Sequence, residues 1–231
     1  MLPSILPSIL VIISASTEWQ FVKNHLNPAG LKNAPLGEWF TSSIQQKEFI
    51  FFHGGWGKIS AAASAQYAIS TWNPQIVVNL GTCGGFSGTS IRKGDLILAD
   101  STLVYDIVEQ MGDPEQAILA YATAIDLSWI HIPPDLPVKK CRLLSADRDI
   151  IPAQVSELVQ KYGAVAADWE SGAIAWVCQK NSVRCLIIRG VTDLVDSLSG
   201  EAYGHFDVFA DGTRLVMAPL LEHLPDWFQD L

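Results

Sequence analysis

Short apolar runs alternate with amphipathic stretches along most of this chain. Six runs have the composition of β-strands and are mostly continuous rather than alternating in apolar residues. They are Ile9–Ala15, Glu48–His53, Ile76–Gly81, Asp95–Ala99, Cys141–Ser145 and Arg184–Val191. Continuous apolar strands are typical of sheets that are covered on both faces. The pattern therefore predicts a central sheet buried between two layers.

Helical periodicity falls between these runs. It predicts helices over Thr17–Leu26, with Ser16 or Thr17 as its cap, and over Lys58–Trp72, Ala153–Tyr162, Glu170–Gln179 and Arg214–His223, with a moderate tendency at Glu115–Ile125. Strands alternating with helices predict one α/β domain over residues 1–231, with a central mixed, largely parallel twisted sheet flanked by helices. The segment Val108–Pro137 is the least patterned, which makes it a candidate insertion around a site.

Composition narrows the class of protein. The chain is 49% hydrophobic and carries a net charge of −9. An acidic surface argues against binding nucleic acid, whose phosphates require a basic one. No apolar run approaches the roughly 20 residues of a membrane helix. The N-terminal "MLPSILPSILVIISAS" lacks the basic region of a signal peptide, and two prolines interrupt it, so its end is interpreted as the first buried strand.

The cysteines and histidines give no metal-binding pattern. Cys83, Cys141, Cys178 and Cys185 lie far apart without a CxxC pair, and we interpret them as free thiols in a reducing cytoplasm. The five histidines show no ligand spacing and are interpreted as surface or structural residues, His205 with the least support.

Ligands of α/β sheets bind beyond the carboxyl ends of the strands, so the residues that follow each strand are candidates for a site. Those segments are "SASTEW" with Glu18, "HGGWGK", "GTCGGF", "SADRD", and "GVTDLVD" with Asp193. Glu170 begins a helix whose next turn is apolar, and burying a carboxylate without a partner there is costly. We expect Glu18, Glu170 and Asp193 to converge at one end of the sheet.

Each candidate also has an ordinary structural explanation. A tight turn after a strand explains the glycines of "GTCGGF" equally well. Asp193 could cap the next helix, and Glu18 could be an exposed acid favoured by the helix dipole. Cys83 is a weak candidate nucleophile, because nothing in the sequence places a histidine beside it.

Three segments, "VVNLGTCGGF", "ADWESGAIAWVC" and "LIIRGVTDLVD", resemble in order and spacing the nucleoside phosphorylase/nucleosidase superfamily, and most of all its 5′-methylthioadenosine/S-adenosylhomocysteine nucleosidases. The resemblance implies hydrolysis of the N-glycosidic bond of a purine nucleoside, such as those two compounds or futalosine, without cofactor or metal. It also implies a homodimer or larger homo-oligomer, which we expect in the cytoplasm that the free cysteines indicate. Phosphate-dependent phosphorolysis and non-catalytic nucleoside binding or storage are the alternatives.

The resemblance assigns roles to individual positions. Asp193 matches the general acid at the purine, Glu18 the carboxylate that activates water, and Glu170 the glutamate that binds the ribose hydroxyls. Further contacts with the nucleoside are implied for Gly81, Thr82, Cys83, Gly84, Asp149, Ile150, Trp169 and Thr192.

The chain departs from the family pattern at three positions. Trp169 replaces the methionine that usually precedes the ribose glutamate, and Asp149 stands where an aromatic residue stacks on adenine. Asn79 stands where the hexameric phosphorylases carry an arginine, so the phosphate pocket is incomplete. We therefore predict water as the nucleophile and an altered recognition of the base.

Overall fold

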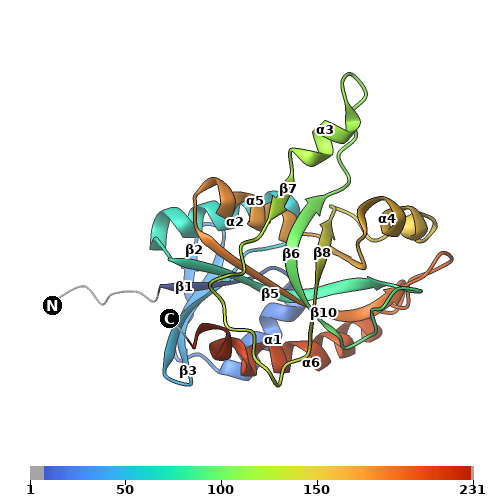
Figure 1. The fold of residues 1–231 in the computed structure, drawn as a ribbon. Coiled ribbons are helices and arrows are strands. Elements are labelled where there is room, and N and C mark those ends of the chain that lie inside the picture. The colour runs from blue at the N-terminus through green and yellow to red at the C-terminus, as the bar shows by residue number, and fades with distance from the viewer. Residues whose placement is uncertain (1–7, 230–231) are drawn as a thin grey trace.

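The computed structural model describes residues 8–229, and within them ten strands form one mixed sheet (Figure 1). The first seven residues of the N-terminal run considered above lie outside this range. The strands are β1 (Ile9–Ile13), β2 (Lys32–Ala34), β3 (Gly37–Ile44), β4 (Lys47–His53), β5 (Ile76–Phe86), β6 (Leu96–Val104), β7 (Ala122–Ala124), β8 (Val138–Ser145), β9 (Ala166–Asp168) and β10 (Arg184–Val195).

The helices lie between these strands in the chain. They are α1 (Ser16–Leu26), α2 (Gly57–Trp72), α3 (Pro114–Leu119), α4 (Val155–Tyr162), α5 (Ser171–Lys180) and α6 (Phe206–Glu222), with short 3-10 helices at Pro152–Gln154 and Leu224–Phe228. Among residues 8–229, none of these helices has the length and apolar character needed to span a membrane.

The centre of the sheet is parallel, as predicted. Strands β10, β5, β1 and β4 are neighbours in this order, and each pair runs parallel. Strand β10 also pairs antiparallel with β6, and β6, β8 and β9 lead back to β5. Because β5 also pairs directly with β10, these strands close a ring of five, in the order β10, β6, β8, β9 and β5, beside the open part of the sheet.

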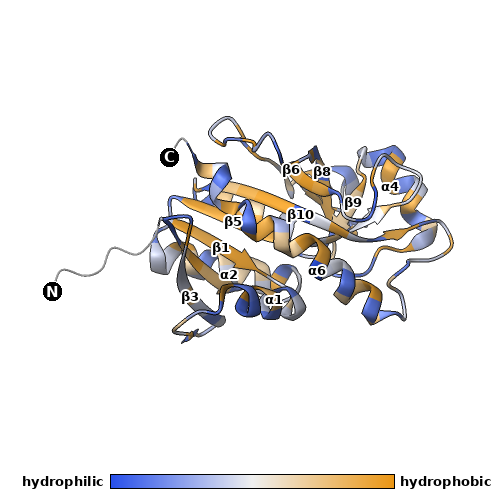
Figure 2. Ribbon diagram, turned by 90° about the horizontal axis from the view of Figure 1, so that it is seen from below, coloured by the Kyte–Doolittle hydropathy of each residue, from blue (hydrophilic) through white to orange (hydrophobic). Residues whose placement is uncertain are grey.

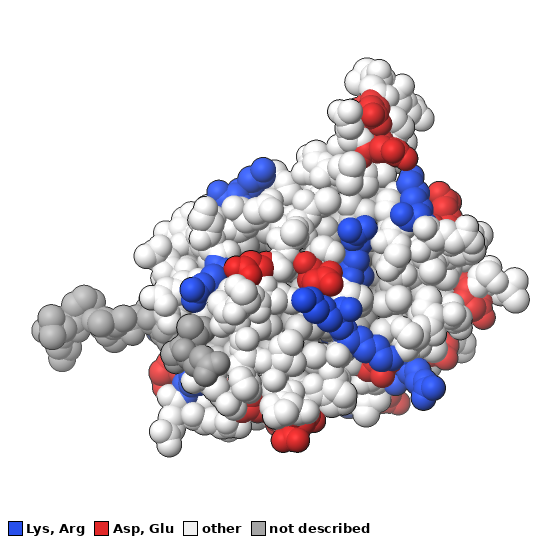
Figure 3. Space-filling view, viewed as in Figure 1, with Lys and Arg blue, Asp and Glu red and all other residues white. Residues whose placement is uncertain are grey.

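Both faces of the parallel strands are buried, which explains their continuous apolar sequences. Alternate residues of β1 belong to different cores: Val11 packs with Trp19 of α1 and Met217 of α6, whereas Ile12 packs with Ala65 of α2. The strands accordingly appear strongly hydrophobic between the helices (Figure 2). On the outer face seen in Figure 3, basic and acidic side chains are interspersed.

The interpretation of "GTCGGF" as a strand-to-loop turn was wrong, because β5 continues to Phe86 beside β10. Its glycines permit close packing instead. A Cβ on Gly84 would lie 2.7 Å from Cδ1 of Ile150, and one on Gly85 would lie 2.8 Å from Cδ2 of Leu194. Strand β10 likewise continues to Val195, so Asp193 lies within a strand rather than after it.

The helix predicted over Glu115–Ile125 is found only in the first part of that segment. Helix α3 ends at Leu119, and Ala122–Ala124 forms β7, which pairs antiparallel with β6. The pairing of Thr123 with Thr102 favours the strand, since β-branched residues suit a sheet. Figure 1 shows α3 projecting from the body of the molecule. Helix α6 also begins earlier than predicted, at Phe206 instead of Arg214.

Candidate active site

A cavity of about 650 Å³ lies at the carboxyl ends of the central strands. Glu18, Glu170 and Asp193 all line it, so the predicted convergence of the three acids is found. The other predicted positions on its wall are Thr82, Cys83, Gly84, Asp149, Ile150, Trp169 and Thr192. The order of strands brings together residues that are far apart in the chain, as sequence reasoning assumed.

Gly81 does not line the cavity but lies behind it. A Cβ at this position would stand 2.0 Å from Nη1 of Arg189 and 2.8 Å from Oε1 of Glu18. Any side chain here would displace one of these two charged groups. Gly81 therefore leaves the space in which an arginine and a glutamate approach the cavity together.

Glu18 is buried in the first turn of α1, so it is not the exposed acid that its ordinary structural explanation would require. Its Oε2 accepts the Ala15 N–H at 3.2 Å, and its Oε1 accepts both the N–H and the hydroxyl of Thr82 at 2.7 Å. The helix begins after Ala15 rather than at a capping Ser16 or Thr17. Burial raises the pKa of Glu18, while Arg189 and the bonds from Thr82 oppose the rise.

Glu170 is the N-cap residue of α5, and its carbonyl accepts the N–H groups of Ala173 and Ile174. Its side chain accepts one bond, from the Gly57 N–H at the start of α2, at 3.0 Å. Gly57 has a φ of +76°, a conformation that favours glycine. Burial and the nearby Asp168 raise the pKa of Glu170 to about 8, against the attraction of Arg189.

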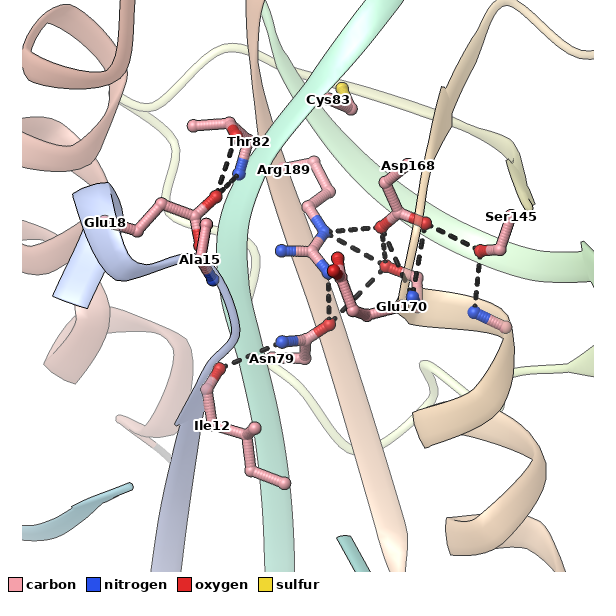
Figure 4. A network of polar contacts seen from close by, with 12 residues as sticks. Ile12, Ala15, Glu18, Asn79, Thr82, Cys83, Ser145, Asp168, Glu170 and Arg189 are labelled. Atoms are coloured by element: carbon pink, nitrogen blue, oxygen red, sulfur yellow. Dashed lines mark hydrogen bonds and ion pairs between the residues drawn. The ribbon is translucent and has the colours of Figure 1, made fainter. Parts of the chain in front are cut away.

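Arg189 lies fully buried beneath the cavity in a dense polar network (Figure 4). Its Nε lies 2.8 Å from Oδ2 of Asp168 and donates to the Ser171 hydroxyl at 3.0 Å. Its Nη2 donates to Oδ1 of Asn79 at 2.5 Å, and the Asn79 amide donates to the Ile12 carbonyl. Nη1 is buried without a hydrogen-bond partner among the described residues, on the side of Gly81 and Glu18.

Asp193 is largely buried in β10, and its Oδ1 accepts the Thr192 hydroxyl at 2.6 Å. Burial raises the pKa of its carboxyl, the Thr192 bond opposes the rise, and the nearby Glu201 and Asp149 add to it. The site thus combines three carboxyls of raised pKa with one guanidinium. Such clusters in cavities are typical of catalytic sites.

Cys83 lines the cavity without the features of a nucleophile. Burial raises the pKa of its thiol well above the ordinary value, and Asp168 adds to the effect, so the thiol stays protonated at neutral pH. All four cysteines are free of disulfide bonds, as predicted.

Comparisons with known proteins agree with this geometry. The model of the phosphorylase superfamily matches residues 9–219. The chain belongs to this superfamily. The family expected from the three sequence segments is thereby confirmed.

Several curated relatives of this superfamily member are named 5′-methylthioadenosine/S-adenosylhomocysteine nucleosidase. One from Halalkalibacterium halodurans is 26% identical over 207 residues, covering 85% of this chain and 89% of the relative. One from Staphylococcus aureus is 24% identical over 225 residues, covering 93% and 97%.

Two solved Helicobacter pylori structures share the fold. A nucleosidase of the same name has a TM-score of 0.79 at 17% identity, covering 96% of this chain and 99% of that one. A futalosine hydrolase has a TM-score of 0.78 at 18% identity, covering 96% and 98%.

Sequence reasoning missed part of the wall of this superfamily site. The unpredicted lining residues include Trp56, Arg148, Asp168, Tyr203, Phe206 and Phe209. His205 lines the cavity too, although it was interpreted as a surface or structural residue. Conversely, no residue of Val108–Pro137 contributes to the lining, so this segment is not an insertion around the described cavity. The motif "GGWGK" was the one signal that could have indicated Trp56.

Proposed function

We propose that this protein hydrolyses the N-glycosidic bond of a purine nucleoside and releases the base. The observation that carries the proposal is the presence of Glu18, Glu170 and Asp193 on one cavity, each with a raised pKa. The names of the nucleosidase and futalosine hydrolase relatives support the same reaction class.

Asp193 is proposed to act on the base. A purine is a poor leaving group as an anion, so departure requires a proton on a ring nitrogen. The raised pKa of Asp193 favours the protonated carboxyl that can donate it. General acid catalysis of this kind contributes about 10²–10⁴-fold to the rate.

Glu18 is proposed to act on water, with Arg189 beside it. The unpartnered Nη1 of Arg189 and the Glu18 carboxylate both lie next to Gly81, and Glu18 lines the cavity, where its carboxylate can hold a water molecule. The water oxygen forms a bond to C1′ and gives its proton to Glu18. The C1′–N bond breaks, and its electron pair leaves with the base, which takes the Asp193 proton. The raised pKa makes ionised Glu18 a stronger base than an exposed glutamate.

Glu170 is proposed to hold the ribose. Gly57 is its single hydrogen-bond donor among the described residues, so the carboxylate retains capacity for two sugar hydroxyls. Hydrogen bonds to a charged acceptor contribute about 1.5–3 kcal/mol each, which offsets the cost of burying the charge. A carboxylate under the ring also stabilises the positive charge that develops on the sugar in the transition state.

Water is favoured over phosphate as the nucleophile. The Thr82 N–H, which could bind an anion, is already bonded to Glu18. Both polar groups of Asn79 are engaged as well, by Ile12 and Arg189. These contacts support hydrolysis rather than phosphorolysis.

Base release separates the candidate functions. Purified protein is incubated with adenosine, inosine and 5′-methylthioadenosine in phosphate-free buffer and in added phosphate. Hydrolysis predicts the same rate of base release in both, with a free sugar product. Strict dependence on phosphate with a sugar 1-phosphate product would establish the phosphorylase alternative, and binding without base release would establish the storage alternative.

We further propose that the protein acts in the cytoplasm as a homodimer or larger homo-oligomer. The projecting segment around α3 supports self-association, because Val108, Met111 and Leu119 expose large apolar side chains there. Sedimentation velocity tests this, and a monomer at micromolar concentration would contradict it.

A further inference from the structure

The first turn of α1 carries Glu18, and it begins without a side-chain cap. The N-cap residue is Ala15, which has no side-chain oxygen to accept an N–H of that turn. The Glu18 carboxylate accepts the Ala15 N–H at 3.2 Å and the Thr82 N–H at 2.7 Å (Figure 4). When the carboxylate takes a proton from water, it becomes a weaker acceptor for these donors. The turn therefore needs a support that does not depend on Glu18.

The end of β4 provides such a support from two sides. Strand β4 runs parallel to β1, with His53 opposite Ile13, and the Gly54 N–H donates to the Ile13 carbonyl at 2.7 Å. This bond holds the chain just before the turn. The His53 ring stacks on the ring of Trp19, which follows Glu18, with centroids 5.5 Å apart and an interplanar angle of 4°. His53 and Gly54 thus hold the chain both before and after Glu18.

Trp19 is held in one orientation by further contacts. It is 2% exposed, and its ring centroid lies 5.3 Å from that of Phe40. Its Nε1 donates to Oε1 of Glu38 at 3.3 Å, and Lys23, one turn further along α1, pairs with the same oxygen. A stacked pair of rings contributes about 0.5–1.5 kcal/mol beyond its buried area. Removing the His53 ring would therefore open space beside the residue that follows Glu18.

His53 takes part in this stack as a neutral ring. Burial lowers the pKa of His53, Glu38 and a hydrogen bond with the Ser14 backbone oppose the fall, and Lys23 adds to it. Its Nε2 is buried without a hydrogen-bond partner among residues 8–229. A protonated ring would place a donor there without an acceptor, which is costly. The imidazole is therefore neutral at pH 7, and a phenyl ring should be able to replace it in the stack.

We propose that His53 is a positioning residue for Glu18. Neither His53 nor Trp19 is among the described residues that line the cavity, so their effect on the reaction passes through Glu18. The end of β4 holds the first turn of α1 so that the Glu18 carboxylate stays in place for the water that attacks C1′. A displacement of about 1 Å in a catalytic geometry lowers a rate by about 10²-fold. The inference rests on the proposed hydrolysis and on Glu18 as the acid that activates water.

Three variants test the stack. His53→Ala should lower kcat for base release about tenfold or more and change KM less than about threefold, because the contacts with the nucleoside remain. His53→Phe keeps a ring against Trp19 and should retain kcat within about threefold of the wild type. His25→Ala is the matched control, because His25 stacks on Phe21 in the same helix, with centroids 5.7 Å apart, away from its first turn. An unchanged kcat in His53→Ala, or an equal loss in either of the other variants, would overturn the proposal.

A double-mutant cycle shows whether His53 acts through Glu18. His53→Ala is combined with Glu18→Gln, in which no carboxylate is left to be positioned. In that background, His53→Ala should lower the residual kcat less than about threefold. A further loss of about tenfold would show that His53 supports another part of the protein, and the positioning role would be rejected.

The placement of Glu18 also has a readout that needs no activity. The Thr82 N–H donates to Glu18, so its hydrogen exchange, followed by NMR, reports whether the carboxylate is in place. Val78 lies deeper in the same strand and is paired on both sides, so its exchange reports a general loss of stability. His53→Ala should speed the exchange of Thr82 about tenfold relative to Val78, whereas His25→Ala should not. An unchanged ratio of the two rates would contradict the proposal.

The two proposals fail in different ways. If the wild type releases no base from any nucleoside, the proposed hydrolysis is wrong, and the exchange ratio still tests whether His53 positions Glu18. If base is released but His53→Ala changes neither kcat nor the exchange ratio, the hydrolysis stands and the positioning role is rejected.

Discussion

The polar network around Arg189 and the cavity above it both contain buried acids. The protein supplies hydrogen-bond donors to these acids to different degrees. Asp168 and Glu170, two residues apart, are almost equally buried, with 6% and 8% of their surfaces exposed. Asp168 contacts the Arg189 guanidinium and accepts bonds from the Ser145 hydroxyl and from Ser171. Among residues 8–229, the Glu170 side chain accepts one bond, from Gly57.

Burial alone therefore does not distinguish a structural acid from a ligand-binding one. What distinguishes them is the number of donors that the protein itself supplies. A buried carboxylate whose donors are all present stabilises the fold, whereas one with spare acceptor capacity retains an unfavourable energy that a ligand can relieve. Glu18 lies between the two, with three protein donors and an arginine nearby.

The largest expected effect concerns Asp168, the acid whose donors the protein itself supplies. Asp168→Asn leaves the buried guanidinium of Arg189 without its ion-pair partner, and breaking a buried pair costs about 3–5 kcal/mol. Urea unfolding should show a loss of this size. Glu170→Gln is the matched control, because Arg189 keeps Asp168 in that variant. Equal destabilisation by the two substitutions would remove the distinction between the two acids.

The next effect concerns Glu170, the acid with spare acceptor capacity. Glutamine at 170 can still accept the Gly57 N–H, but its NH₂ group would face the sugar hydroxyls. Ribonucleosides should lose about 1.5–3 kcal/mol of transition-state stabilisation. Nucleosides without the 2′-hydroxyl should lose less, because they never made that bond. The measurement is kcat/KM for matched ribo- and deoxyribonucleosides, and an identical loss for both would show that Glu170 does not bind the diol.

A further effect concerns the pH dependence of stability. Folding raises the pKa of Glu170 from its ordinary value of 4.5 to about 8, so the folded state binds the proton more tightly. The resulting stabilisation is complete below about pH 4.5 and declines as the pH rises through about 8. Glu18 and Asp193 contribute with the same sign. The fall in Tm of the ligand-free protein from about pH 5 to about pH 9 should be smaller in Glu170→Gln than in the wild type. An unchanged slope would show that Glu170 is not the group whose ionisation opposes folding.

The sequence predicted the parallel core because its strands are covered on both faces and therefore have continuous apolar sequences. Strand β2 at the edge of the sheet, its part-exposed neighbour β3, and the short β7 and β9 were not predicted, because part-exposed or very short strands carry a weaker pattern. The glycines near Gly84 were misread because turns and close packing both require glycine. Their packing partners, such as Ile150, are distant in the chain.

The candidate site was predicted to the extent that its residues are acids following strands. Glu18 and Asp193 were found as acids after predicted strands, although Asp193 lies within β10. Glu170 was found as an acid at the start of an apolar helix, and the resemblance supplied the roles of all three. Trp56 and Phe206 were not found, since an apolar residue in a cavity wall has the same sequence signature as one in a core. The pairing of Arg189 with Asp168 depends on how β10 and β9 meet in the sheet, and no local pattern encodes it.

The separate roles of the acids are tested most directly with a substrate whose leaving group does not need a proton from Asp193. The wild type and Asp193→Asn are compared on a purine nucleoside and on 4-nitrophenyl β-ribofuranoside, whose leaving group departs without a proton. The proposed mechanism predicts that kcat on the purine nucleoside falls by about 10²-fold or more, while activity on the nitrophenyl riboside falls less than about tenfold. A similar loss on both substrates, or a loss below about tenfold on the purine nucleoside, would contradict the assignment of Asp193 as the acid that releases the base.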